Sequence, residues 1–241
     1  MSVFLEARLL AKNFRGLRAV AEVSFVVPEQ GIVALIGPNG AGKTTVFNLI
    51  AGVFPATSGS VFFAGRDLTG LRPDQVCAAG IGRTFQIVKP FPDLTVLENV
   101  TVGALHRTSS VADAKAEARR VLALLDMADR THLPASSLTL PDRKRLEVAR
   151  ALATRPRLLL LDEVMAGLRP TETDRMVVTL RKLRDETGLT ILLIEHVMRA
   201  VMALSEQVIV LHHGEKIADG TPQEITRDPK VVESYLGAGM V

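Results

Sequence analysis

The segment GPNGAGKT, at residues 37–44, has the composition and spacing of a loop that binds phosphate. Its glycines let the main chain curl, so that successive N–H groups point toward one anion at the start of a helix. Lys43 is placed to reach the β- and γ-phosphates of a nucleotide, and the Thr44 hydroxyl is placed to bind Mg²⁺. The residues that we predict to form this site are Gly37, Pro38, Asn39, Gly40, Ala41, Gly42, Lys43, Thr44 and Thr45.

Other polar residues follow apolar segments and are candidates to act on the same nucleotide. Asp162 and Glu163 follow RLLLL, and an Asp at the end of a buried strand suits Mg²⁺. A neighbouring Glu can orient or deprotonate the attacking water. Gln86 ends GRTFQ and can bind Mg²⁺ or that water, whereas His196 follows TILLIE, where an imidazole can reach a γ-phosphate. Taken singly, each of these residues is also compatible with a structural role.

The stretch LTLPDRKRLEVARAL, at residues 138–152, has the signals of a helix start followed by a basic amphipathic run. Thr139 and Asp142 match the [ST]-x-x-[DE] pattern of a helix cap, and Pro141 is tolerated in a first helical turn. The start of this helix therefore either meets a ligand or serves only as a cap. The residues alone leave both interpretations open.

Continuous apolar runs predict the buried strands that position these polar residues. The runs are residues 32–36, RLLLLDE at 157–163 and TILLIEH at 190–196. Helical periodicity is found at 112–128 and 171–187, and the segment from 90 to 138 is expected to be mostly helical. Buried strands that alternate with helices predict an α/β fold with a mainly parallel sheet.

Alternating apolar and polar residues predict a second, smaller and antiparallel sheet. This pattern is found in VAEVSFVVPEQG at 20–31, and a further short strand is expected in TSGSVFFAGRDLTG at 57–70. The segment QVIVLHHGEKIADG, at 207–220, predicts a hairpin that turns at Gly214.

The composition narrows the class of protein. The 241 residues are 47% hydrophobic with one Tyr and no Trp, which is enough for one large domain with an aliphatic core. The net charge of +3 does not require a nucleic-acid partner, and we expect none. Cys77 is the single cysteine, which excludes an internal disulfide and fits a reducing compartment. Neither a signal-peptide pattern nor a run of 18 apolar residues is visible, so any membrane role is expected to come through a partner.

The order of these motifs along nearly the whole chain resembles that of the ATP-binding subunit of ABC transporters. The resemblance implies ATP and Mg²⁺ as the bound species. It implies that Phe14 is the aromatic residue that stacks on adenine and that Gln86 links the nucleotide to a membrane partner. It also implies that Asp162 binds Mg²⁺, that Glu163 is the catalytic glutamate and that His196 is the switch histidine.

In this family, residues 138–142 take the place of the signature L-S-G-G-Q, which binds the γ-phosphate held by the opposite subunit. Thr139 replaces the Ser and Asp142 replaces the Gln, whereas Pro141 has no N–H to donate. The Thr139 hydroxyl, the Leu140 N–H and the helix dipole remain as contacts. The resemblance therefore favours a working but weaker signature, and a pure helix cap is the alternative.

Several further segments are similar to the ATPases of branched-chain amino-acid importers. They are GIGRTFQ, LTVLENV, KRLEVARAL, AGLRPTE, LHHGEKIADGTPQEI and the closing VVESYLG. The fold implied is a P-loop NTPase core with a mainly parallel sheet, a small antiparallel β-subdomain and an inserted helical subdomain. Within a single domain of residues 1–241, the expected parts are the antiparallel subdomain at 1–30 and 56–80, the nucleotide-binding core at 31–55 and 155–241, and the helical subdomain with the signature at 83–150.

The resemblance also implies partners and a place in the cell. Two ATPase subunits, either identical or paralogous, would dimerise around ATP, with residues 166–168 in the loop that crosses their interface. Their motion would drive transmembrane permease subunits that dock on the helical segment, and a solute-binding protein would act indirectly. The chain is therefore expected in the cytoplasm, on the inner face of the cell membrane, held there by the permease.

Three alternatives compete with the importer. One is the ATPase of another ABC transport system, such as a lipid exporter. A non-transport ABC ATPase usually carries two nucleotide modules or a long coiled-coil insertion, and neither is visible. A switch-like P-loop binding protein is disfavoured by Asp162, Glu163, Gln86 and His196.

Overall fold

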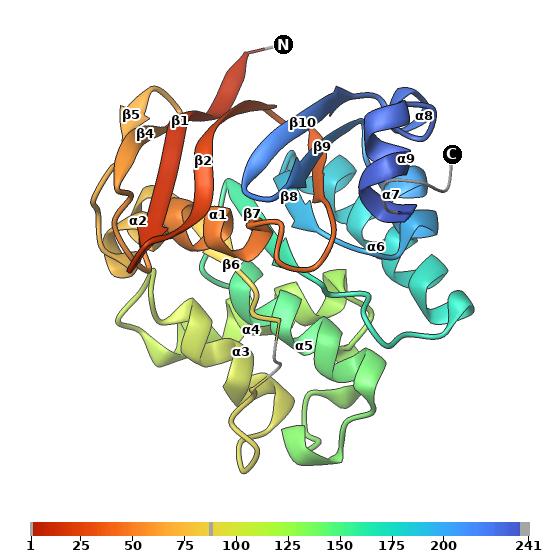
Figure 1. The fold of residues 1–241 in the computed structure, drawn as a ribbon. Coiled ribbons are helices and arrows are strands. Elements are labelled where there is room, and N and C mark those ends of the chain that lie inside the picture. The colour runs from red at the N-terminus through yellow and green to blue at the C-terminus, as the bar shows by residue number, and fades with distance from the viewer. Residues whose placement is uncertain (1, 87–88, 237–241) are drawn as a thin grey trace. The chain divides into compact units, whose positions relative to one another are not determined.

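The computed structural model describes residues 2–86 and 89–236 (Figure 1). Gly237, which ends the motif VVESYLG, lies outside the described residues. The chain divides into two compact units, the first made of Met1–Val76 and Thr190–Val241 and the second of Cys77–Leu189. The finer subdivision expected from the sequence stays a prediction.

The first unit contains the predicted antiparallel sheet. Its strands are, in spatial order, β2 (Leu17–Pro28), β1 (Val3–Phe14), β4 (Ser58–Phe63) and β5 (Arg66–Asp67). Residues Leu5, Val27 and Phe63 are buried, and β1 pairs with both β2 and β4. Apolar alternation gives this sheet one packed face, as a period of two requires.

The first unit also holds the parallel strands that lead to the phosphate loop. They are β3 (Ile32–Ile36), β8 (Thr190–Ile194) and β9 (Gln207–His212), and β3 pairs in parallel with both of the others. Every residue of β3 and β8 is buried, which explains their continuous apolar runs. β10 (Glu215–Gly220) pairs antiparallel with β9 through the predicted turn at Gly214, whose φ is 83°.

Four helices accompany these strands in the described part of the first unit. They are α1 (Lys43–Ile50), α7 (Met198–Leu204), α8 (Pro222–Ile225) and α9 (Pro229–Leu236). The boundary between the units falls within α2 (Pro73–Ala79).

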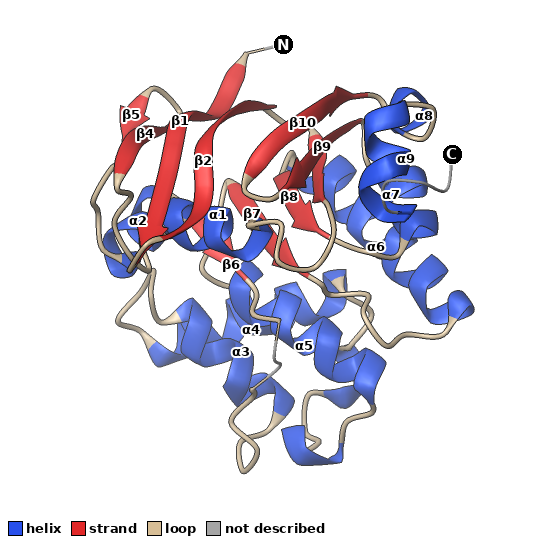
Figure 2. Ribbon diagram, in the orientation of Figure 1, coloured by secondary structure: helices blue, strands red, loops and turns tan. Residues whose placement is uncertain are grey.

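The second unit combines two parallel strands with most of the helices (Figure 2). The strands are β6 (Ile81–Arg83) and β7 (Leu158–Asp162), paired from Ile81 with Leu158 onward. The helices are α3 (Val96–Ala104), α4 (Val111–Leu124), η1 (Ala128–Arg130), η2 (Ala135–Ser137), α5 (Leu140–Leu152) and α6 (Pro170–Thr187). The α/β fold with a parallel and a small antiparallel sheet is therefore confirmed.

One predicted helix is shorter than expected. The apolar periodicity at 112–128 predicted a helix to residue 128, but α4 ends at Leu124. Asp126 has a φ of 54°, and a single left-handed residue cannot continue a right-handed helix. The predicted C-terminal boundary was wrong, because the spacing of apolar residues does not show where a left-handed residue ends the helix.

The helices of residues 2–86 and 89–236 include none that is both long and apolar enough to cross a lipid bilayer. The 18-residue α6 is amphipathic, with Met176, Leu180 and Leu183 buried and Lys182 exposed.

Candidate functional site

The phosphate loop joins β3 to α1 in the first unit. Gly37, Gly40 and Gly42 have φ values of 148°, 81° and 97°, which side chains other than that of glycine rarely adopt. A Cβ on Gly37 would lie 2.1 Å from the Leu211 carbonyl oxygen. Glycine at this position is therefore required both by the backbone conformation and by the space beside it.

The Lys43 ammonium lies inside the phosphate loop and is bonded to the loop's own carbonyl groups. Its Nζ donates to the carbonyl oxygens of Gly37 at 2.7 Å and of Pro38 at 2.9 Å, and the residue is only 8% exposed. Gly42 is the N-cap of α1 and has no side chain to bond the first N–H groups, and the first helical turn carries no acidic residue. A helix start of this kind attracts an anion through its N–H groups and its dipole.

A hairpin turn supports the loop from within the same unit. The N–H of Gly214 donates to the Ala41 carbonyl at 3.1 Å, and the Gly214 carbonyl accepts from the Ala21 N–H at 2.8 Å. Gly214 therefore links the phosphate loop to β2. The sequence interpretation identified this turn but assigned it no part in the site.

Phe14 ends β1 and keeps part of its ring exposed, at 41%. Its ring meets that of Phe54 edge-on, with the centroids 5.3 Å apart. The Lys12 ammonium lies 5.2 Å from the Phe14 centroid and donates to the Pro55 carbonyl at 2.7 Å. These contacts fix the ring, and stacking on adenine stays a prediction.

Two other residues of the first unit bear on the site. His196 lies two residues beyond the end of β8 and is exposed. Tyr235 of α9 is hydrogen-bonded to the main chain of Gly37, and burial raises the pKa of its hydroxyl against the influence of that bond. The segment that contains Tyr235 resembles the importer ATPases, but nothing in its residue pattern predicts a contact with the phosphate loop.

In the second unit, the predicted magnesium ligand Asp162 ends β7 and is 1% exposed. Its Oδ2 accepts from Arg83 at 3.2 Å, and its N–H donates to the Thr84 hydroxyl at 3.0 Å. Burial raises the pKa of this carboxyl, whereas the Arg83 charge opposes the rise. No sequence pattern predicted a role for Arg83, because an ion pair across 79 residues leaves no local signal.

The chemistry of Asp162 fits a bound Mg²⁺. Among the described residues, its buried Oδ1 has no hydrogen-bond partner, and an uncompensated carboxylate oxygen suits a hard cation. Residues 2–86 and 89–236 contain no group of three or more His, Cys, Asp or Glu side chains placed to hold a metal ion. Mg²⁺ typically takes one or two protein carboxylates and completes its shell with phosphates and water.

Glu163 follows Asp162 and adopts a left-handed backbone, with a φ of 51°. Such a conformation costs a residue other than glycine about 1–3 kcal/mol and persists only where its surroundings hold it. Its Oε2 accepts from Gln86 Nε2 at 2.9 Å, and its carbonyl accepts from Lys144 Nζ at 2.8 Å. The structure therefore brings the predicted Gln86 and Glu163 together and adds Lys144, which the sequence analysis did not identify.

The signature-like segment begins α5, and its side chains bond differently from the prediction. Thr139 is the N-cap residue, but its side chain makes no capping bond. Its hydroxyl instead donates to Asp142 Oδ2 at 2.8 Å, and Asp142 Oδ1 lies 3.0 Å from Arg130. The predicted capping box was therefore wrong: Arg130 and the Thr139 hydroxyl hold the Asp142 carboxylate, and the Thr139 side chain caps no helix N–H. Pro141 lies in the first turn, as expected, and the Leu140 side chain is exposed.

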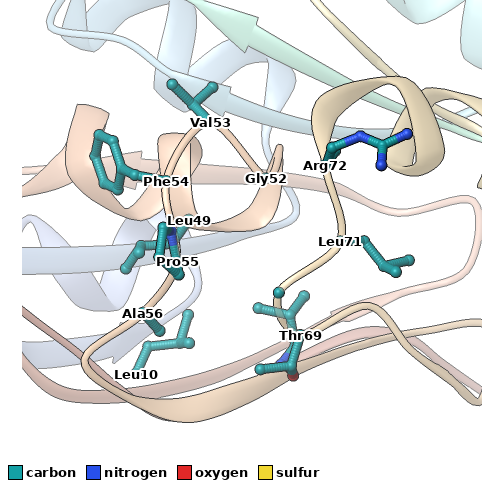
Figure 3. A pocket seen from close by; sticks show the side chains of 12 residues that line it. Leu10, Leu49, Gly52, Val53, Phe54, Pro55, Ala56, Thr69, Leu71 and Arg72 are labelled. Atoms are coloured by element: carbon teal, nitrogen blue, oxygen red, sulfur yellow. The ribbon is translucent and has the colours of Figure 1, made fainter.

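A cavity of about 180 Å³ lies beside the C-terminal end of α1 in the first unit (Figure 3). Phe54, Leu71 and Arg72 are among the twelve described residues that line it, and Arg72 is the only charged one among them. Arg72 pairs with Asp74 at 2.9 Å. The apolar lining does not suit a nucleotide, so the candidate site rests on the phosphate loop at the other end of α1.

The family model described as "ABC transporter" matches residues 20–166. A second model, described as "Branched-chain amino acid ATP-binding cassette transporter", matches residues 215–240.

Individual proteins are similar over almost the whole chain. The high-affinity branched-chain amino acid transport ATP-binding protein BraF of Pseudomonas aeruginosa is 39% identical, covering 97% of each chain. The corresponding LivG of Escherichia coli K12 is 40% identical, covering 95% of each chain. A crystal structure titled as the ADP conformation of an ATP-binding cassette of an ABC transporter superposes with a TM-score of 0.90 at 30% identity, covering 98% of this chain and all of that one.

The loop geometry predicts that Gly37→Ala and Gly40→Ala differ in stability. Both positions have positive φ, but only at Gly37 does a Cβ meet backbone, because nothing lies within 4 Å at Gly40. We expect Gly37→Ala to lower the free energy of unfolding by about 2 kcal/mol more than Gly40→Ala, from overpacking alone. Urea denaturation without nucleotide measures the difference, and equal losses would contradict the proposed clash.

Proposed function

The chain belongs to the ABC transporter family, and from that membership we propose that it is the ATP-binding and ATP-hydrolysing subunit of an importer for branched-chain amino acids. The observation that carries the substrate class is similarity to BraF and LivG along almost the whole chain. The C-terminal match at residues 215–240 supports it independently.

Nucleotide binding is assigned to the phosphate loop and its surroundings. The chain binds ATP or ADP, as an ATP-binding cassette does. The main chain of residues 37–42 and the Lys43 ammonium would hold the phosphates, with Thr45 adding a hydroxyl and Phe14 stacking on adenine.

Mg²⁺ would be held by three side chains of this chain. They are Thr44, Asp162 and Gln86, and the unpartnered Oδ1 of Asp162 supports the assignment. When bound, the ion neutralises charge that develops on the phosphates. For Gln86 to take part, its side chain must exchange the bond to Glu163 for a bond to the metal or to water.

Hydrolysis requires that water be deprotonated as it attacks the γ-phosphorus. Glu163 accepts the proton, the water oxygen bonds to phosphorus and the bond to the bridging oxygen breaks, which leaves ADP and phosphate. His196 would contact the γ-phosphate through its imidazole, and its exposure at the end of β8 supports this role.

Two subunits, either identical or paralogous, would complete each site. Thr139, Leu140 and Asp142 of one subunit would contact the γ-phosphate held by the other, and loss of that phosphate would let the pair separate. The Thr139 proton is already donated to Asp142, and Pro141 has no N–H. These two features support a signature that works but binds more weakly.

Permease subunits would dock on the second unit and hold the chain at the inner face of the cell membrane. Large exposed side chains support this docking, with Phe85 57% and Phe91 44% exposed. Covering these side chains would remove apolar surface from water, which stabilises association with a protein partner. A solute-binding protein would act through the permease.

Glu163→Gln tests the assigned chemistry. We expect the variant to bind ATP with unchanged affinity and to stay dimeric with ATP, while hydrolysis falls at least about 100-fold because the base is lost. Phosphate release and size-exclusion chromatography with light scattering measure the two effects. Glu186→Gln, on the exposed face of α6, is the matched control and should turn over as wild type. Normal turnover of Glu163→Gln would remove Glu163 from the catalytic role.

Pro141→Gly tests the weakened signature. The change restores one N–H in the first turn of α5, so we expect the ATPase rate to rise by about twofold to fivefold, as one neutral hydrogen bond allows. Pro170→Gly makes the same change in the first turn of α6 and should not raise the rate. A fall in the rate of Pro141→Gly, with ATP binding intact, would favour the pure helix cap.

Reconstitution tests the transported class. The chain, purified with its permease subunits in lipid nanodiscs, should hydrolyse ATP several-fold faster when a solute-binding protein loaded with leucine, isoleucine or valine is added. The same binding protein without amino acid is the control. Co-purification with a lipid-exporting permease, or stimulation by lipid alone, would support the exporter alternative instead.

A further inference from the structure

The main chain at Glu163 adopts an unfavourable conformation and is held there by a contact from α5. Its φ of 51° lies in the left-handed region, and Glu lacks the short polar side chain that eases this region for Asn or Asp. The carbonyl of Glu163 accepts from the Ala166 N–H at 3.2 Å and from Lys144 Nζ at 2.8 Å. The first bond belongs to the same turn, whereas the contact with Lys144 attaches this turn to α5.

Lys144 is suited to this contact. It lies one helical turn after Leu140, the first residue of α5, and it is 5% exposed. A buried ammonium requires acceptors, and a charge-assisted bond to a carbonyl is about twice as strong as a neutral one. The bond therefore fixes the direction of the Glu163 carbonyl, and with it the peptide from which the side chain projects.

A second residue of α5 holds the neighbouring loop. Glu147 follows Lys144 by three positions, which places it on the same side of the helix. Its buried carboxylate accepts from the Phe85 N–H, and the next residue, Gln86, donates to the Glu163 carboxylate at 2.9 Å. Three hydrogen bonds, Lys144 to Glu163, Gln86 to Glu163 and Phe85 to Glu147, thus join α5 to the chain at Phe85–Gln86 and at Glu163 within the second unit. We call this set of bonds the ring, because the main chain of α5 and the Phe85–Gln86 peptide close it.

The ring connects the catalytic glutamate to the signature-like segment of its own subunit. That segment, Thr139 to Asp142, forms the start of α5, and Lys144 lies about 6 Å beyond Leu140 along the helix axis. A short helix moves as one body, so a displacement of its start reaches the Glu163 carbonyl through Lys144.

We propose that Lys144 is a positioning residue that fixes the Glu163 main chain to the signature helix, so that engagement of Thr139–Asp142 by an opposing nucleotide sets the Glu163 carboxylate for proton transfer. This inference rests on the proposed function of Glu163 as the base. It adds to that function a route by which one nucleotide site senses the other.

Lys144→Met is the first test, because it keeps an unbranched side chain and removes the ammonium. In the full-length chain we expect kcat for ATP to fall about tenfold, which corresponds to the loss of one positioning bond. KM for ATP should change less than about twofold, because the phosphate loop is intact. Lys144→Arg restores a cationic donor and should recover most of kcat. Lys182→Met makes the same change on the exposed face of α6 and should behave as wild type.

A double variant separates positioning from a general loss of structure. If Lys144 acts through Glu163, Lys144→Met in a Glu163→Gln background should cause no further loss of the residual rate. A further tenfold loss in that background would overturn the inference. So would a wild-type kcat in Lys144→Met, or failure of Lys144→Arg to recover activity while it binds ATP normally.

One further variant covers a failure to fold, and the Glu163→Gln result separates the role of Lys144 from the proposed function. If Lys144→Met is insoluble, Lys144→Gln provides a neutral donor and the same kcat and KM comparison. Normal hydrolysis by Glu163→Gln would refute the proposed function itself. An inactive Glu163→Gln beside a fully active Lys144→Met would refute only the role of Lys144.

Discussion

The burial of the Lys43 ammonium within a glycine-rich turn is the interaction on which the rest of the site depends. A charge that is removed from water must be compensated, and here the carbonyls of Gly37 and Pro38 compensate it until phosphates can do so. To present those carbonyls, the chain must turn through backbone conformations open to glycine. The buried strand β3, the helix α1 and the hairpin turn at Gly214 all serve to hold that turn in place.

In the second unit, Asp162 and Glu163 also need compensating contacts. The glutamate stands beside a buried Asp162 and in a strained backbone, and neither feature would persist without support. Arg83 and Thr84 bond Asp162, while Gln86 and Lys144 bond Glu163. Strain and burial are thus found at the same two residues, and bonds from β6, from the residues that follow it and from α5 offset their cost.

Much of the fold could be predicted because burial imposes local patterns. Residues 32–36 and 190–194 are apolar throughout because both of their faces are covered, and the hairpin around Gly214 was visible from its turn and flanking alternation. The end of α4 was missed, since the left-handed Asp126 leaves no mark in the apolar period. At Thr139 the pattern located the helix start correctly but assigned the wrong partner to the hydroxyl, because Arg130 and Asp142 meet only in the folded chain.

The sequence by itself determined which chemistry is possible: a curled anion-binding turn with its lysine, and carboxylates at the end of an apolar strand. These follow from neighbouring residues, whose spacing along the chain is also their spacing in space. Only the tertiary structure decided which groups bind one another, such as Arg83 with Asp162 and Lys144 with the main chain of Glu163. Contacts between residues so far apart in the sequence depend on how strands and helices pack against one another. Such packing leaves no repeating residue pattern in a single sequence.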